Sequence, residues 1–312
     1  MKSQTIPLEY PFMLKKSPHE DAVEKQISIW IDDYSCLPES LKKRYRKSNF
    51  GKFTTCLFPN ANAEQSLTMG KWILAAFAFD DLYGSLSAEE LKIKCRKVIC
   101  LLEGNDFQYD ENEIFKALFE AGKEFHPHVT SSWMKRLIDD HEFWFDGMIQ
   151  ETEYSYTGKA IYPTLEEYKV IREKVSGGRL MCDFLEISSG FIMPDEVFRH
   201  PVILRIRQLI TFMLSWFNDI HSVPWELERG EATNLVLVIK NEQNCSFEEA
   251  YEKAVKIHND DLEEFIQISK NLPDFGVYND DVKRYLHNAE LFLKGQELWY
   301  FGGTERYTSA EK

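Results

Sequence analysis

Long apolar segments are scarce in this sequence. The longest, WILAAFAF at residues 72–79, is far too short to span a bilayer. The first residues carry charge but no sustained apolar stretch of the kind found in secretory signals. Basic residues are comparatively few, 37 against 51 acidic ones, and the net charge of −14 argues against a surface that binds nucleic acid. We therefore expect a cytoplasmic protein with no membrane span and no nucleic-acid partner.

Paired cysteine motifs and linker sequences are also missing. None of the six cysteines belongs to a Cys-x-x-Cys pair, so no zinc site of that kind is expected and the cysteines should be reduced thiols. There is no repeat and no low-complexity linker. The 312 residues, 44% of them hydrophobic, are enough for a substantial core. We expect a single domain over residues 1–312, with roughly 20 N-terminal and 5 C-terminal residues mobile.

Strand-like alternation is nearly absent, whereas apolar residues recur with a helical period almost everywhere. The sequence therefore predicts an all-α protein of roughly ten helices. The ranges expected to be helical are 64–79, 85–103, 131–156, 163–175, 179–191, 195–229 (in one or two pieces), 246–271 and 280–299.

Two helix starts and one helix break can be located from residue type. Thr164 with Glu167, and Ser246 with Glu249, have the spacing of a capping box, in which each pair satisfies two backbone N–H groups. Two adjacent glycines at 177–178 interrupt a helical pattern and predict a break there.

A row of polar side chains occupies one face of the helical segment 216–231. Asn218, Ser222 and Glu226 are spaced four residues apart, so they share that face. Their oxygen atoms are hard donors that suit Mg²⁺ or Mn²⁺ rather than zinc. The row is a candidate for one wall of a metal–diphosphate site, although three residues of such common types could equally form a solvated stripe.

Asp80 and Asp81 end the apolar segment KWILAAFAFDD and are a candidate for a second wall. Similar pairs in polar or mixed surroundings occur at residues 32–33, 139–140, 260–261 and 280–281. Only the apolar context sets the first pair apart. Arg172 and Arg306 are candidate phosphate ligands, because a guanidinium group donates two parallel hydrogen bonds, but isolated arginines are most often surface residues.

The order and spacing of these motifs resemble the microbial class I terpene synthases, the metal-dependent terpenoid cyclases. NDIHSVPWE matches the pattern N-D-x-x-S-x-x-x-E, and DDLYG is similar to the aspartate-rich motif of that family. Arg172 stands 46 residues before Asn218, where microbial members carry a diphosphate-sensing arginine, and the break that follows it resembles the family's helix interruption. WYFGGTERY resembles the C-terminal segment with an Arg-Tyr pair. The resemblance covers about residues 60–310 and implies a helical bundle around a central apolar cavity.

The resemblance also implies the site and its chemistry. Three Mg²⁺ ions, for which Mn²⁺ can substitute, would be held by Asp80, Asn218, Ser222 and Glu226, with Asp81 either a further ligand or a hydrogen-bond support of the closed state. The diphosphate would be contacted by Arg172, Arg306 and Tyr307. The leaving group then departs, and alkene π bonds attack the allylic cation inside an apolar pocket. Candidates for the pocket wall are Phe77, Phe184 and Trp299, for which ordinary core packing is the alternative.

Two departures from the family pattern stand out. Gly84 occupies the place where a third acid is often found, and Trp225 precedes Glu226 where many members have a basic residue. The implied activity is cyclisation of a linear prenyl diphosphate to a terpene hydrocarbon or alcohol, with C15 farnesyl diphosphate slightly favoured over C20 geranylgeranyl diphosphate. Distant alternatives are a prenyl-chain-elongating transferase, disfavoured because a second D-D-x-x-D motif is missing, and a non-catalytic helical binding protein. A homodimer is compatible with the sequence, which identifies no surface for it.

Overall fold

The computed structural model describes residues 8–105, 112–155 and 161–306, and in these ranges it contains helices and no strand. This agrees with the predicted all-α class. The α-helices are α1 (Glu20–Asp33), α2 (Glu39–Ser48), α3 (Phe50–Leu57), α4 (Ala63–Tyr83), α5 (Ala88–Leu102), α6 (Glu113–Phe125), α7 (Ser131–Ser155), α8 (Leu165–Val175), α9 (Gly178–Ser189), α10 (Asp195–Phe198), α11 (Pro201–Arg229), α12 (Leu235–Gln243), α13 (Phe247–Lys270) and α14 (Asn279–Gly302). Short 3₁₀ helices lie at His126–His128 and Gly276–Tyr278.

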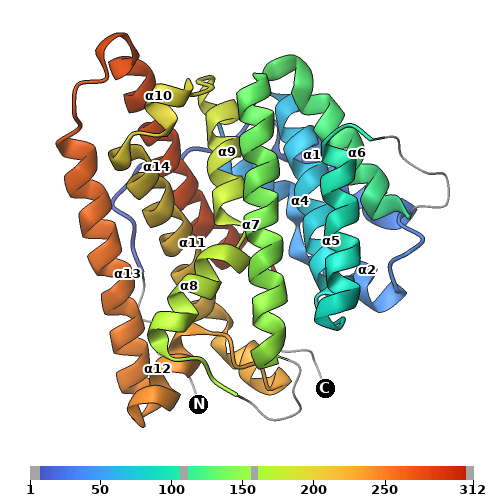
Figure 1. Cartoon of the computed structure of the whole chain (residues 1–312), viewed down its shortest axis with the longest axis vertical. Helices are drawn as coiled ribbons and strands as arrows, with labels where there is room; N and C mark the ends of the chain where they lie inside the picture. Colours follow the sequence, from blue (N-terminus) through green and yellow to red (C-terminus); the bar gives the residue numbers. More distant parts are fainter. Residues whose placement is uncertain (1–7, 106–111, 156–160, 307–312) are drawn as a thin grey trace.

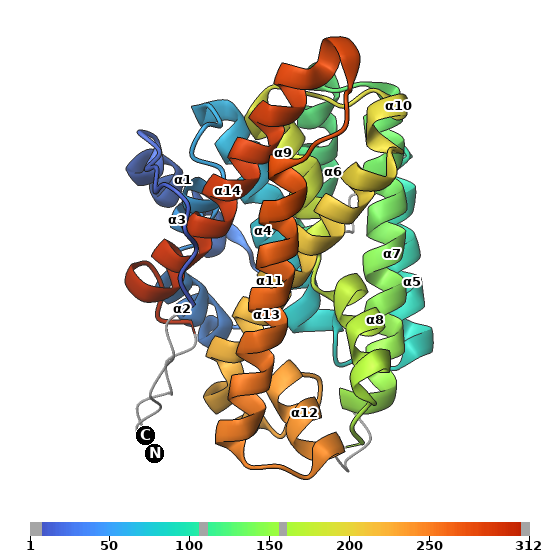
Figure 2. The ribbon, with the colours of Figure 1, turned by 90° about the vertical axis from the view of Figure 1, so that its left-hand side faces the viewer.

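The long helices run roughly along the longest axis of the molecule and form a bundle (Figure 1). On one side α11 packs against α9, α12 and α13, and on the other α4 packs against α1 and α6 (Figures 1 and 2). Between them α7 contacts α5 and α8, and α3 joins α1 to α14. Among the described residues, none of the helices combines the length and apolar character that a membrane crossing needs.

Both predicted capping boxes are confirmed. The side chain of Thr164 accepts from the backbone N–H of Glu167 and the Glu167 carboxylate accepts from Thr164, at the start of α8. Ser246 and Glu249 form the same pair at the start of α13. Helix α4, which carries the aspartate pair, begins with a box that we did not predict, at Asn62.

Some helix limits differ from the expected ones. α4 extends beyond the expected end at Asp80 and Asp81 to Tyr83, so the two carboxylates lie in its last turn. The segment 195–229, expected in one or two pieces, forms two helices, α10 and α11, and α11 continues through Pro224 without ending.

The N-terminal stretch packs against the bundle from residue 8 onward, in contrast to our expectation that about 20 residues are mobile. Leu8 and Tyr10 are each only 2% exposed. The Tyr10 hydroxyl lies 2.7 Å from Nε2 of His258 on α13, and Lys294 on α14 donates to the Tyr10 carbonyl. The expected mobility of the last five residues concerns a segment outside the described residues.

Glycines allow two pairs of helices to approach closely. A Cβ atom at Gly178 would lie 2.7 Å from the side chain of Thr211, so α9 can begin against α11 only with glycine there. A Cβ atom at Gly295 would lie 1.9 Å from the carbonyl oxygen of Cys56, which fixes α14 against α3. These backbone contacts hold helices that supply walls of the central cavity.

Candidate active site

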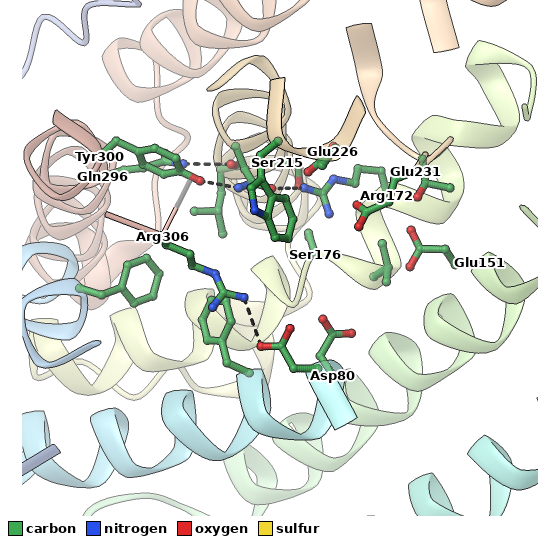
Figure 3. Close-up of a pocket in the computed structure, with 18 of the residues that line it drawn as sticks. Asp80, Glu151, Arg172, Ser176, Ser215, Glu226, Glu231, Gln296, Tyr300 and Arg306 are labelled. Carbon is green, nitrogen blue, oxygen red and sulfur yellow. Dashed lines mark hydrogen bonds and ion pairs between the residues drawn. The ribbon is translucent and has the colours of Figure 1, made fainter. Parts of the chain in front are cut away.

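A cavity of about 610 Å³ opens between α4, α7, α8, α11 and α14 (Figure 3). Its polar lining includes carboxylates and guanidinium groups from helices far apart in the sequence. Its apolar lining is provided by Phe53, Phe77, Val175, Leu214, Trp225 and Trp299. The cavity therefore combines a charged region with an aromatic and aliphatic one.

Asp80 and Asp81, in the last turn of α4, have different surroundings. The Asp80 side chain is exposed to the cavity, where withdrawal from bulk water and the charges of Asp81 and Glu151 raise its pKa to about 7. The Asp81 carboxylate is held by an ion pair with Arg44, a 2.6 Å hydrogen bond from Tyr45 and a 3.4 Å contact with Arg306. Burial would raise the pKa of Asp81, but the two arginines outweigh it and lower that pKa. Asp80 thus faces the cavity, whereas Asp81 anchors arginines.

The polar row on α11 is only partly directed at the cavity. Asn218 and Glu226 line it, whereas the Ser222 hydroxyl is buried and donates to the Asn218 carbonyl at 2.8 Å, a common arrangement for serine in a helix. Glu226 accepts a 2.7 Å hydrogen bond from Asn234, and burial together with the charge of Asp219 raises its pKa to about 8. The row is therefore not a solvated stripe, since it lies against the cavity and the core.

Arg172 of α8 reaches across to α11. Its Nη2 atom lies 2.7 Å from Oδ1 of Asn218 and 2.7 Å from Oδ1 of Asp219. Asp219 is almost fully buried and also accepts from the Tyr168 hydroxyl and, at 3.0 Å, from the backbone N–H of Leu235. Burial opposes the charge of Arg172, but the neighbouring Asp219 carboxylate outweighs it and raises the pKa of the guanidinium. The arginine is thereby fixed beside the polar row.

The predicted helix break brings a loop to the cavity wall. α8 ends at Val175, Gly177 adopts a left-handed conformation with φ of 67°, and α9 begins at Gly178. The Val175 carbonyl accepts a 3.1 Å hydrogen bond from the indole of Trp144. Both Val175 and Ser176 line the cavity.

The C-terminal end of the described chain closes one side of the cavity. The Arg306 guanidinium carbon lies 4.8 Å from the centre of the Phe77 ring, and both residues line the cavity. Trp299 lines it as well, with its indole N–H donating to the Ser48 carbonyl at 2.9 Å. Tyr307, the second residue of the Arg-Tyr pair, lies outside the described residues.

The expectation that Phe184 lines the cavity is wrong. Its side chain is fully buried, with ring-centre distances of 5.1 Å to Trp72, 5.3 Å to Phe125 and 6.1 Å to Phe58. It is a core residue, because the face of α9 that carries it turns toward α4 and α6 rather than toward the cavity.

Several residues of the site were not found from the sequence. Asp219 is part of the N-D-x-x-S-x-x-x-E pattern and could have been recognised, because a buried arginine needs a carboxylate nearby. Arg44 comes from a segment remote from the motifs. Tyr300 belongs to the segment WYFGGTERY, but its contact with Asn218 follows only from the fold. Glu151 of α7 and Glu231, just after α11, also line the cavity (Figure 3), and no local pattern marks either of them.

Several side chains of the cavity carry oxygen atoms that could bind a metal ion. In the part of the chain that the structure describes, no three His, Cys, Asp or Glu side chains form a group that could hold one. The row on α11 is of another type, with an amide, a hydroxyl and a carboxylate oxygen, and Asp80 lies on the opposite side of the cavity. Such hard oxygen donors suit Mg²⁺, which commonly takes few protein ligands and completes its shell with water and phosphate. The residues present fit that ion.

Comparison with known proteins gives one consistent family. The family model for terpene synthase family 2, C-terminal metal binding, matches residues 71–264, more than half of the chain. Germacrene A synthase of Nostoc punctiforme is 25% identical, with 97% of this chain and 94% of that protein covered. The (+)-T-muurolol synthase of Roseiflexus castenholzii, named as cyclising (2E,6E)-farnesyl diphosphate, is 24% identical, with 98% and 94% covered.

Among solved structures, the 2-methylisoborneol synthase of Streptomyces coelicolor, crystallised with Mg²⁺ and 2-fluoroneryl diphosphate, superimposes with a TM-score of 0.84. The two sequences are 20% identical, and 96% of each chain is covered, so this likeness bears on the fold alone. The family match covers α4 to α13, including the helices that carry Asp80, Arg172 and Asn218. The chain therefore belongs to terpene synthase family 2, whose members carry a C-terminal metal-binding region.

Proposed function

We propose that the whole chain, as a single domain, is a class I terpene cyclase acting on farnesyl diphosphate. It ionises this linear C15 prenyl diphosphate, releases diphosphate and forms a cyclic hydrocarbon or alcohol. The observation that carries the proposal is one cavity with Asp80 on one side, Asn218 and Glu226 on the other, and guanidinium groups beside an aromatic wall. The choice of C15 rests on relatives whose names include cyclisation of (2E,6E)-farnesyl diphosphate.

The metal is proposed to be Mg²⁺, as three ions, with Mn²⁺ able to replace it. Asp80 would hold it from α4, and Asn218, Ser222 and Glu226 from α11, with Ser222 turning its hydroxyl from the backbone carbonyl. Bound there, the metal would neutralise charge that develops on the departing diphosphate. Asp81 is proposed to hold arginines rather than metal, since three donors already occupy its carboxylate.

Arginine side chains are proposed to bind the diphosphate itself. Arg172 and Arg306 both line the cavity and donate from two of its sides, and Tyr307 follows Arg306 directly in the chain. Fixed donors of this kind favour the leaving group because they need little reorganisation when its charge appears. Anchoring at Asp219 and at Asp81 keeps the two guanidinium groups aimed at one region.

The aromatic wall would fold the chain and stabilise the cation. The rings of Phe77 and Trp299 line the cavity and present π systems, whose negative faces attract a passing carbocation. Apolar neighbours such as Leu214 would keep water away from the carbocation, which favours attack by the alkene over early capture of the cation by water.

Incubation with prenyl diphosphates tests the proposal. The protein with Mg²⁺ is given C10, C15, C20 and C25 substrates separately, and extracts are analysed by gas chromatography–mass spectrometry. We expect a cyclic product from the C15 substrate, lost on chelation. A product from C20 alone would refute the C15 assignment, and no product or released diphosphate from any substrate would refute the function.

Two substitutions test the metal site. Asp80→Ala and Asn218→Ala should each abolish turnover while leaving the circular dichroism spectrum unchanged. Asp139→Ala is the matched control, because Asp139 also belongs to an Asp-Asp pair but faces solvent on α7. Near-normal turnover in either cavity variant would show that the metal site is assigned wrongly.

A further inference from the structure

The amide of Asn218 lies between two side chains with different hydrogen-bonding abilities. Arg172 donates to its Oδ1 atom at 2.7 Å, and its Nδ2 atom donates to the Tyr300 hydroxyl (Figure 3). A guanidinium group has donors and no acceptor, so the end of the amide facing Arg172 has to be the oxygen. The hydroxyl on the other side then receives the amide N–H.

This orientation bears on metal binding, because only the oxygen end of an asparagine can bind a cation. An amide turned over would aim two N–H groups at Arg172 and at any metal. Arg172 is itself proposed to engage the diphosphate, and its hold on Oδ1 weakens when it does. The Tyr300 hydroxyl is then the partner that keeps the N–H end away from the cavity.

The ring of Tyr300 is fixed to the same helix that carries the amide. It makes an edge contact with Phe217 at 5.2 Å and a tilted contact with His221 at 5.5 Å, both on α11. Phe217 precedes Asn218 directly, and His221 lies about one turn later. The neighbouring Trp299 makes an edge contact with the Tyr300 ring at 5.0 Å, and Tyr300 itself lines the cavity. Tyr300 on α14 is therefore held against α11, the helix whose side chain it orients.

We propose that Tyr300 is a positioning residue that orients the Asn218 amide so that its oxygen faces the metal. The inference rests on the proposed function, since it assumes that Asn218 is a metal ligand. Tyr300 touches neither metal nor reacting carbon in this role and acts through the amide alone. Its removal should weaken metal binding more than it weakens the fold.

Thermal unfolding of the full chain measures Mg²⁺ binding in each variant and does not require turnover. Mg²⁺ is titrated at a fixed concentration of inorganic diphosphate, and the metal concentration for half-maximal stabilisation is read for each variant. In Tyr300→Phe we expect this concentration to rise roughly three- to tenfold, the range expected for losing one hydrogen bond. Tyr285→Phe is the matched control, because Tyr285 is a buried tyrosine of the same helix whose hydroxyl contacts the Cys182 carbonyl.

Repeating the Tyr300→Phe measurement in an Asn218→Asp variant separates an effect on the orientation of the amide from an effect on packing. In Asn218→Asp the side chain has two oxygens and no N–H group, so no orientation needs to be chosen. There Tyr300→Phe should change the half-maximal Mg²⁺ concentration less than twofold, because the hydroxyl can only compete with the metal for a carboxylate.

The outcomes distinguish this inference from the proposed function. An equal weakening by Tyr300→Phe in both backgrounds, or a lower melting temperature with an unchanged half-maximal Mg²⁺ concentration, would overturn the positioning role. If the unaltered protein gains no stability from Mg²⁺ with diphosphate, the metal site of the proposed function fails, and the inference fails with it.

Discussion

Replacement of Asp219 by asparagine gives the most direct measure of how Arg172 is held. Arg172 and Asp219 form an ion pair at 2.7 Å in which the carboxylate side chain is 1% exposed and the guanidinium 15%. The other carboxylate oxygen accepts from the Tyr168 hydroxyl and the Leu235 backbone N–H. The NH₂ group of an asparagine would face either Arg172 or the Leu235 N–H, which can only donate, so neither orientation could satisfy it fully.

The expected loss of stability follows from the burial of this pair. Removing one partner of a buried ion pair typically costs about 3–5 kcal/mol, because the other charge stays buried without compensation. With an unfolding entropy of about 2.1 cal/mol/K per residue, a loss of 1 kcal/mol lowers the melting temperature of this 312-residue chain by about 1.5 °C, so a decrease of about 5–8 °C is expected. Turnover should also fall, because Arg172 loses its anchor.

Denaturant unfolding of the metal-free protein is the assay, with calorimetry as a second probe. Asp146→Asn is the control, because Asp146 pairs with Lys174 on the exposed face of α7 and should cost less than about 1 kcal/mol. Adding Arg172→Met to Asp219→Asn should recover part of the loss, with a coupling of at least roughly 1 kcal/mol. A loss below about 1 kcal/mol for Asp219→Asn, or strict additivity in the double variant, would refute the reasoning.

Three further predictions concern the aromatic wall, a buried histidine and the arginine that pairs with Asp81. Phe77→Ala should change the product mixture seen by gas chromatography–mass spectrometry. Phe184→Ala should instead cost about 3–5 kcal/mol of unfolding free energy and leave the product ratios unchanged. The reverse pattern would mean that Phe184 lines the cavity and Phe77 belongs to the core. Burial lowers the pKa of His141 to about 4, against about 6.5 in the unfolded chain, so the unfolded state takes up its proton first and stability falls as pH drops through this window. Between pH 7 and 5 the free energy of unfolding, measured by denaturant titration, should therefore fall by roughly 2 kcal/mol more in the unaltered protein than in His141→Gln. An equal decrease in both proteins would contradict this. Arg44→Ala removes one of the guanidinium groups on Asp81 and should lower kcat/KM about tenfold by misplacing the end of α4 that carries Asp80, while unaltered kinetics would show that the contact is only structural.

The sequence predicted local features better than it predicted orientation. The capping boxes at Thr164 and Ser246 and the helix break at residues 177–178 depend on neighbours within a few residues, so residue type alone located them. Which way a helix face points depends on every helix packed around it. For that reason Phe184 was assigned to the cavity although it belongs to the core.

Site residues from distant segments could not be found for the same reason. Arg44 meets α4 only after α2 has packed. Tyr300 belongs to WYFGGTERY, but it meets Asn218 only after α14 has packed against α11. Ser222 illustrates a related limit, because its place on the correct helix face does not show whether its hydroxyl points outward or back to the Asn218 carbonyl.

The close contacts at the glycines have a consequence for laboratory evolution of the product. At positions 178 and 295 a side chain would collide with a neighbouring helix, so libraries that vary these positions should yield mostly misfolded protein. Leu214, Val175 and Phe53 line the cavity from three separate helices, and each already carries an apolar side chain. Substitutions there can reshape the space offered to a folded isoprenoid one wall at a time, while the helical frame and the charged end stay in place.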